Sequence, residues 1–499
     1  MKMVKSLILG SAAALVAMSG AQAADLPVKA KAVEYVRICS LYGAGFFYIP
    51  GTDTCIKLGG YLRVDTTFNG GIYDSPAWNG SLGTGDRTRD NWAARSRLAL
   101  TVDTRTATEY GVVRTFGQLD MNTNTDNFSA GGAELAVEMG FIQFAGFTFG
   151  RSASAYATPW HGYPGNNTSF LVGGHDTVTG TNNIQYTAQF GNGVSATIGL
   201  DDPYTFNRTA LLNLGNGVFV PAGLSAVGVG TDTYAGSYMP DVVGNIRIDQ
   251  AWGLFQLSGA LHEVRATYNS TTNLNLGHPD TKYGGSVMAA LQIKNIPTGP
   301  GDDIKIDGSW AQGDMKNIFG TSAGSANFLM LGGVPGQFGP NNTLGFGTLT
   351  DGVFLPVAAL GDGAIHLTEG FGVRGAFNHN WDPYWSTSLF GGAMWVNYDN
   401  TAKAEYCAAY TGNLRATTSN ALGADFHCDP NYSLSMLGAI TRWTPVKNLT
   451  FSAEAIWTHL NTNFSGTAFF SPGAPQPQQT WTYHNQDTVS FNVRAQRNF

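Results

Sequence analysis

The last eleven residues, Val489-Ser-Phe-Asn-Val-Arg-Ala-Gln-Arg-Asn-Phe499, alternate between apolar and polar side chains. Val489, Phe491 and Val493 share one parity, whereas Arg494 lies on the other. Since a β-strand directs successive side chains to opposite faces, this segment predicts a strand with one apolar face and one wet face. The chain then stops on Phe499, an ending typical of bacterial outer-membrane barrels.

The opposite end of the chain predicts export. Lys2 and Lys5 precede the apolar run 7–18, and Ala21-Gln-Ala23 matches a small-residue cleavage site. Residues 1–23 are therefore expected to be a signal peptide, which leaves 24–499 as a single barrel domain. The alternative, an N-terminal membrane anchor, is disfavoured because the apolar run is too short to span a bilayer.

The composition favours a membrane β-barrel. Charged residues make up 13% of the chain, compared with about 25% in ordinary globular proteins. The chain has 64 Gly and 12% aromatic residues, yet after the signal it has no uninterrupted apolar run of about 18 residues. Without Lys2 and Lys5 the net charge is about −9, which argues against nucleic-acid binding.

Alternating segments recur along the chain. Residues 182–190 and 194–201 form a clear hairpin pattern around the turn Gly191-Asn-Gly193. The same criterion yields sixteen candidate strands: 56–67, 90–106, 109–121, 133–144, 147–151, 182–190, 194–201, 241–250, 254–263, 282–294, 303–313, 366–378, 384–398, 432–442, 449–460 and 482–499.

The connections between these strands alternate between short and long. Short turns include 145–146 and 191–193, and long loops include 152–181 and 314–365. This predicts an all-β fold, a 16-stranded antiparallel transmembrane barrel with short periplasmic turns and long external loops. The sheet must close, because lipid offers no partner for an unpaired backbone group. A soluble sandwich or propeller is disfavoured by the loop alternation and by the lack of a 40–50-residue repeat.

Basic side chains gather on the wet faces of the early strands. Because Leu58, Leu62 and Val64 are assigned to lipid, the opposite parity should face the lumen, where charges avoid a cost of about 2–4 kcal/mol. Arg105, beside a turn, is expected at the rim. The predicted lumen set is Lys57, Arg63, Arg95, Arg97, Arg114 and Arg151.

The loop 152–181 is the candidate constriction. It follows an unusually short strand, so it can start low in the barrel and fold inward. It contains Trp160, His161, Tyr163 and His175, and its one acidic residue is Asp176. The two histidines are expected to be hydrogen-bonded or solvated rather than to act as a pH gate.

The four cysteines fall into two local pairs, Cys39/Cys55 and Cys407/Cys428. In an exported chain disulfides between local pairs are expected, although four cysteines allow three connectivities and the sequence alone does not choose. No CxxC or HxxxH spacing indicates a metal, and no catalytic or cofactor motif stands in a suitable context. We therefore expect no enzyme, no cofactor and no metal, with a barrel hydrolase as the enzymatic alternative.

Several blocks together resemble the alphaproteobacterial general porins. The most specific is 35–61, YVRICSLYGAGFFYIPGTDTCIKLGGY, and the others are 24–27, 141–144, 443–449 and 494–499. The resemblance implies a homotrimeric pore in the outer membrane of a Gram-negative bacterium, in contact with lipid and lipopolysaccharide. It also implies an inward third loop and recognition of Phe499 by the barrel-assembly machinery.

The expected function is passive diffusion of small hydrophilic solutes and ions. General porins usually place several acidic residues on the inward loop, whereas this loop offers Asp176 alone. Basic residues faced by a single acidic residue favour anions. The negative charges of distant loops should matter less, because they are screened within about 8 Å. The alternatives are a solute-specific porin and a surface adhesin or receptor barrel acting through loops such as 314–365 and 399–431.

Overall fold

The computed structural model describes residues 37–71, 91–125, 134–166, 171–203, 208–215, 229–270, 272–320, 327–333, 338–416, 419–472 and 477–499. The expected signal peptide, 1–23, lies outside the described residues. Among the helices in these ranges, none has the length and apolar character needed to cross a membrane.

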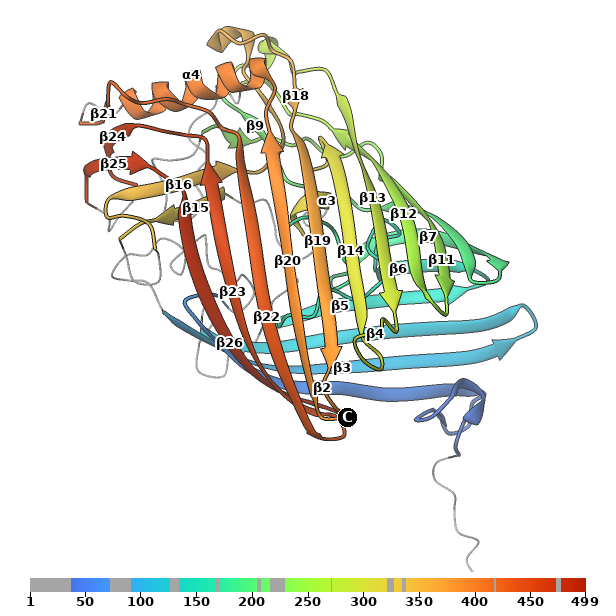
Figure 1. Cartoon of the computed structure of the whole chain (residues 1–499). Helices are drawn as coiled ribbons and strands as arrows, with labels where there is room; N and C mark the ends of the chain where they lie inside the picture. The colour runs from blue at the N-terminus through green and yellow to red at the C-terminus, as the bar shows by residue number, and fades with distance from the viewer. Residues whose placement is uncertain are drawn as a thin grey trace, which may run out of the picture.

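Sixteen antiparallel strands form one closed sheet, as the sequence predicted (Figure 1). Each strand pairs with the next, and the first barrel strand pairs with the last from Tyr61↔Asn498 to Phe68↔Phe491, which closes the ring. The barrel strands are β2 (Thr54–Phe68), β3 (Trp92–Thr108), β4 (Gly111–Asn124), β5 (Glu134–Phe144), β6 (Phe147–Ser152), β7 (Thr181–Gly191), β8 (Val194–Asp201), β11 (Asp241–Gln250), β12 (Gly253–Val264), β13 (Lys282–Lys294), β14 (Asp303–Gln312), β19 (Glu369–Asn380), β20 (Trp385–Asn397), β22 (Tyr432–Val446), β23 (Leu449–Thr462) and β26 (Gln486–Asn498).

Tight turns join the strands at one end of the barrel, which we call the turn end. Ala145 and Gly146 have φ values of 49° and 86°, and Asn192 and Gly193 have values of 50° and 73°. Two successive residues with positive φ suit the right-handed twist of the flanking strands. At Gly193 a side chain is also excluded, because a Cβ would lie 1.9 Å from the Asp249 carbonyl oxygen.

The two faces of the barrel follow the predicted parity. On β2 the side chains of Leu62 and Val64 are about half exposed on the outside, whereas Asp65 and Thr67 are buried inside. On β26 Phe491 points outward, whereas its sequence neighbours Ser490 and Asn492 point inward and are buried. The outer face is therefore the apolar surface that meets lipid.

The long connections form a folded cap at the other end, the loop end, where Figure 1 shows α4 (Asn400–Ala416) opposite the C-terminus. The cap holds two small sheets, built from β10 (Thr231–Asp232), β9 (Ala210–Asn213), β17 (Thr350–Phe354) and β18 (His366–Leu367), and from β15 (Asn327–Leu331), β16 (Thr343–Thr348), β25 (Gln479–Tyr483), β24 (Thr467–Phe470) and β21 (Ala421–Leu422). Short helical turns are η4 (Leu274–Leu276), α3 (Lys316–Phe319) and η5 (Val357–Ala359).

The sequence predicts only long loops for these connections, whereas the structure has strands and helices in them. The apolar core of the cap continues into the barrel, and within it Phe346, Tyr410, Phe464 and Tyr483 pack ring against ring. The aromatic residues come from three different connections, 313–368, 398–431 and 463–485, so no single segment shows a local pattern for it.

Two disulfides join the local cysteine pairs. Cys39–Cys55 ties the segment containing η1 (Ser40–Tyr42) and β1 (Phe47–Tyr48) to the start of β2. Cys407–Cys428 ties α4 to the connection between β21 and β22. Each bond therefore fixes a segment that lies outside the barrel wall.

Candidate constriction of the barrel

The connection between β6 and β7, of which the structure describes residues 153–166 and 171–180, contacts the inside of the barrel wall; we call it the inward loop. Its first residues are held by inward side chains of two strands. Asn245 on β11 donates to the Ala155 carbonyl oxygen at 2.6 Å, and Gln256 on β12 donates to that of Ala157 at 2.7 Å. Amide side chains on the wet face thus replace water as partners for the loop backbone.

The far part of the loop reaches strands on the other side of the ring. The Tyr163 hydroxyl donates to Asp307 on β14. The Asn166 side chain contacts Asn492 on β26 at 2.8 Å and Ser452 on β23 at 3.0 Å. The inward loop therefore extends across the lumen, from β6 to the strands next to the closing seam.

A buried ion pair locks the returning half of the loop. Arg374 on β19 lies 3.3 Å from Asp176 and 3.1 Å from Asp307, and it also donates to the His175 carbonyl oxygen at 3.0 Å. Gly173 packs beside it with φ of 109°, where a Cβ would lie 2.5 Å from the Val373 carbonyl oxygen. Asp176 is 1% exposed, so the one acidic residue of the loop is turned into the wall and away from the lumen.

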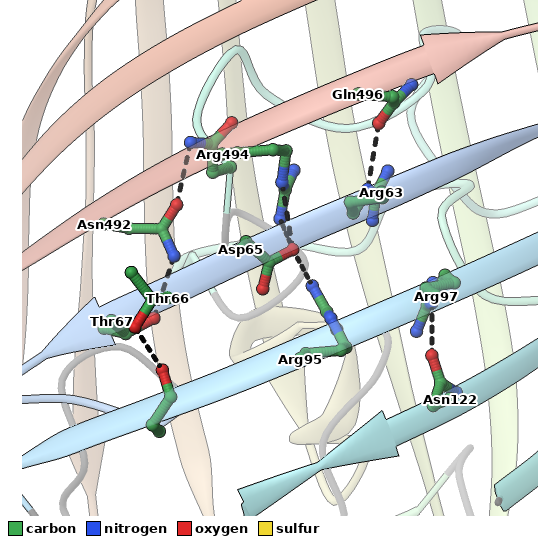
Figure 2. Close-up of polar contacts among 12 residues, drawn as sticks. Arg63, Asp65, Thr66, Thr67, Arg95, Arg97, Asn122, Asn492, Arg494 and Gln496 are labelled. Atoms are coloured by element: carbon green, nitrogen blue, oxygen red, sulfur yellow. Dashed lines mark hydrogen bonds and ion pairs between the residues drawn. The ribbon is translucent and has the colours of Figure 1, made fainter.

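Four arginines from three strands form a basic surface on the inner face of the barrel, which we call the arginine wall: Arg63, Arg95, Arg97 and Arg494. The strand register places these side chains together, because Asp65 on β2 lies directly opposite Arg494 on β26 and Arg95 on β3. Figure 2 shows both guanidinium groups reaching the same carboxylate, at 3.1 and 2.9 Å. Charge-assisted hydrogen bonds to one acceptor hold these three strands together.

The next row toward the turn end places Arg63 and Arg97 directly opposite each other. Like charges at this position repel, and Asp120 offsets the repulsion by pairing with Arg97 at 2.7 Å. Arg63 donates instead to the Gln496 side chain at 2.9 Å and lies over the Tyr61 ring, 4.6 Å from its centre. Arg63 therefore keeps its charge without a carboxylate partner among the described residues.

The other predicted lumen residues lie apart from this wall. Arg114 shares Asp103 with Arg105, at 3.0 and 3.1 Å. Lys57 is exposed, with its ammonium 5.9 Å from the centre of the Phe46 ring. These groups belong to the turn end, where Arg105 was expected.

Arg151 is the penultimate residue of β6 and donates to the Glu138 carbonyl oxygen at 3.2 Å. It is thus near the start of the inward loop and not in the arginine wall. Of the six basic residues in the predicted set, the structure brings together Arg63, Arg95 and Arg97.

Several partners were not in the predicted set. Parity places Arg494 on the wet face of the last strand, although not in the predicted lumen set, and the same parity argument could have identified Asp120. Arg374 and Asp307 also lie on inward positions, but their role depends on a loop that is distant in sequence. Glu454, near Arg494, and Glu138, near Arg97, moderate the positive charge of the wall.

The closed sixteen-stranded barrel with its inward loop agrees with comparisons to known proteins. A family described as the Porin subfamily matches residues 25–492. The chain belongs to this porin family. This porin is 37% identical over 336 residues to porin Omp2b of Brucella abortus (strain 2308), covering 64% of this chain and 84% of the relative. Omp2b of Brucella melitensis biotype 1 is 36% identical with the same coverage.

Among solved structures, the outer membrane channel DcaP of Acinetobacter baumannii has a TM-score of 0.54 and 14% identity. The match covers 91% of this porin and 99% of that chain, and it shows a shared fold. The family and the barrel together identify the protein as a diffusion channel that is integral to the outer membrane of Gram-negative bacteria. This confirms the expected class of function and location.

Replacing Asp65 by Asn should destabilise the barrel, because Arg95 and Arg494 would lose their shared carboxylate in a buried site. Breaking a buried pair in this way costs about 3–5 kcal/mol. Urea unfolding of the protein in lipid vesicles measures the change. The control is Asp249→Asn, since Asp249 pairs with Arg247 and Lys294 at an exposed position and should change stability by less than about 1 kcal/mol. Equal effects of the two variants would contradict the role of Asp65.

His175 should stay neutral between pH 5 and 8. Burial lowers the pKa of His175 to about 4, and this effect outweighs the hydrogen bond to Asn317, which raises the pKa. His175 is therefore protonated at a much lower pH in the folded state than in the unfolded state. Stability should therefore fall as the pH drops from about 6.5 toward 4, and His175→Asn should remove that part of the dependence. Thermal unfolding across this range tests it, with the exposed His161→Asn as control. A conductance step near pH 6.5 that disappears in His175→Asn would instead show that His175 is protonated in the physiological range.

Proposed function

We propose that this porin is a general pore for small hydrophilic solutes, with its constriction between the inward loop and the arginine wall and with a weak preference for anions. The observation that carries the proposal is the charge contrast between the two surfaces. One surface presents four arginines with Asp65 and Asp120, and the other has its single carboxylate, Asp176, buried against Arg374.

The preference should be weak because most of the arginines are paired. Arg95 is 4% exposed, and Arg97 shares its charge with Asp120. Arg63 is the group best placed to act on a passing ion, since it is partly exposed and its hydrogen-bond partner is neutral. A single unpaired charge at a constriction attracts anions and repels cations without forming a tight binding site.

The aromatic residues of the inward loop favour a general pore over a solute-specific one. A specific sugar site would need exposed rings along the lumen. Trp160 and Tyr163 are 7% and 5% exposed and pack edge to face against each other. Their role is to support the loop, so selection by solute size is expected.

Assembly forms a further part of the proposal. The family resemblance supports a homotrimer embedded in outer-membrane lipid and in contact with lipopolysaccharide. At the turn end, Phe499 continues the closing seam through reciprocal backbone hydrogen bonds with Gly60, at 3.1 and 3.3 Å. Phe499 is 61% exposed, which supports recognition of this residue by the barrel-assembly machinery.

Liposomes containing the porin should swell at rates that fall smoothly with solute mass across a series of sugars and amino acids. Size is the expected criterion because Trp160 and Tyr163, the aromatic residues considered for a sugar site, are buried. Protein-free liposomes are the control. A solute that enters much faster than others of its mass would identify a specific porin instead.

Replacing Arg63 by Gln should lower the anion-to-cation permeability ratio roughly twofold, since one charge about 8 Å from the ion path contributes a few tenths of a kcal/mol in water. The reversal potential of single channels under a KCl gradient measures this ratio. Arg247→Gln is the control, because Arg247 pairs with Asp249 at the exposed turn end. An unchanged reversal potential in Arg63→Gln, or a cation-selective wild type, would refute the assigned preference.

A further inference from the structure

A histidine and three carboxylates meet in the cap, away from the pore. Asp362 and His366 belong to the connection 313–368, and Asp399 and Glu405 belong to the connection 398–431, at the start of α4. Ligand atoms of Asp362, His366 and Glu405 all lie within 4.8 Å of one another. Two loops that are separate in sequence thus supply one cluster.

The two ring nitrogens of His366 have different surroundings. Nε2 lies 3.0 Å from Asp362 Oδ2, and Nδ1 lies 3.1 Å from Asp399 Oδ2. Metal-binding histidines use one nitrogen as the ligand, while the other donates its hydrogen to a carboxylate that sets the tautomer and the ring orientation. Asp399 stands in the position of that second carboxylate. Nε2, which contacts Asp362, is then the nitrogen that would bind a cation held between it, Asp362 and Glu405.

Glu405 is already oriented. Its side chain is buried, and its two carboxylate oxygens accept hydrogen bonds from the backbone N–H groups of Leu355, at 3.1 Å, and Asp362, at 2.9 Å. Each carboxylate oxygen has two acceptor sites, so one site on each oxygen remains available. A ligand held in this way loses little conformational freedom when a cation binds.

The local charge also favours a cation. Among the described residues, neither a lysine nor an arginine forms an ion pair with Asp362, Asp399 or Glu405. Asp362 and Asp399 pair with His366 instead. Lys282 on β13 is the basic group whose charge acts on Asp362, and Lys403 pairs with Asp429 instead. Three carboxylates therefore surround one imidazole with little compensation.

We propose that Asp362, His366 and Glu405 form a zinc-class divalent metal site that ties the connection 313–368 to the start of α4, with Asp399 as the orienting carboxylate. A mixed imidazole and carboxylate set suits Zn²⁺, whereas Ca²⁺ and Mg²⁺ prefer oxygen ligands alone. Three protein ligands leave a position for water. The site would join two parts of the cap and does not depend on the ion preference of the pore.

Calorimetric titration of the chelator-treated porin in detergent with ZnCl₂ tests the site. We expect one Zn²⁺ per chain, a raised unfolding temperature when it binds, and little heat from CaCl₂ or MgCl₂. His366→Ala should weaken binding at least tenfold. Asp399→Asn should weaken it by a smaller factor, since Asp399 orients the imidazole and does not bind the metal. Single-channel conductance in chelator should match that of the wild type in both variants, which confirms folding.

The matched control is His278→Ala, because His278 lies in another loop, where its Nδ1 contacts the Pro279 carbonyl oxygen and forms no ion pair with a carboxylate of the described residues. If His366→Ala does not fold, Glu405→Gln removes a ligand charge and keeps a carbonyl oxygen for the backbone. Unchanged Zn²⁺ binding in these variants would overturn the proposal. So would no Zn²⁺ binding by the wild type, or Ca²⁺ binding as tight as Zn²⁺ binding.

Discussion

Closure of the sheet between β2 and β26 is the constraint on which the rest of the structure depends. A strand in lipid must find partners for all its backbone groups, and an open edge would leave a whole row unpaired. The seam from Tyr61↔Asn498 to Phe68↔Phe491 removes both edges. The same register brings Arg494 beside Asp65 and Gln496 beside Arg63, so the pairing that closes the barrel also assembles the arginine wall.

The inward loop is held in place by side chains of the barrel strands. Its backbone has no sheet partner, and inward amides and ions supply the missing contacts. The central one is Arg374, whose guanidinium holds Asp176 and Asp307 together in a fully buried position. Burying a charge is favourable only when it is well paired, so this contact specifies one position of the loop. It also pairs Asp176 with Arg374, so that this carboxylate does not face the lumen. The resulting charge contrast underlies the proposed anion preference.

Local patterns were sufficient for the strands and turns. The 182–190 and 194–201 hairpin was predicted with its turn, and the structure has β7 and β8 at nearly the same positions. For the site, parity alone placed Arg63, Arg95 and Arg97 inside. It did not reveal that Arg95 would be neutralised by Asp65, or that Lys57 and Arg114 would lie near the turn end, because depth and pairing depend on the stagger between strands.

The sequence by itself determined the barrel, its sixteen strands, its lipid face and the alternation of turns and loops. These follow from a period of two and from turn residues, and both act over a few positions. Tertiary structure alone decided the Arg494–Asp65–Arg95 contact, the burial of Asp176 and the aromatic core of the cap. Their partners lie up to 429 residues apart, as Arg494 and Asp65 do. Contacts over such distances have no local signature, because they arise only when the closed sheet sets which side chains share a depth and when the loops pack against them.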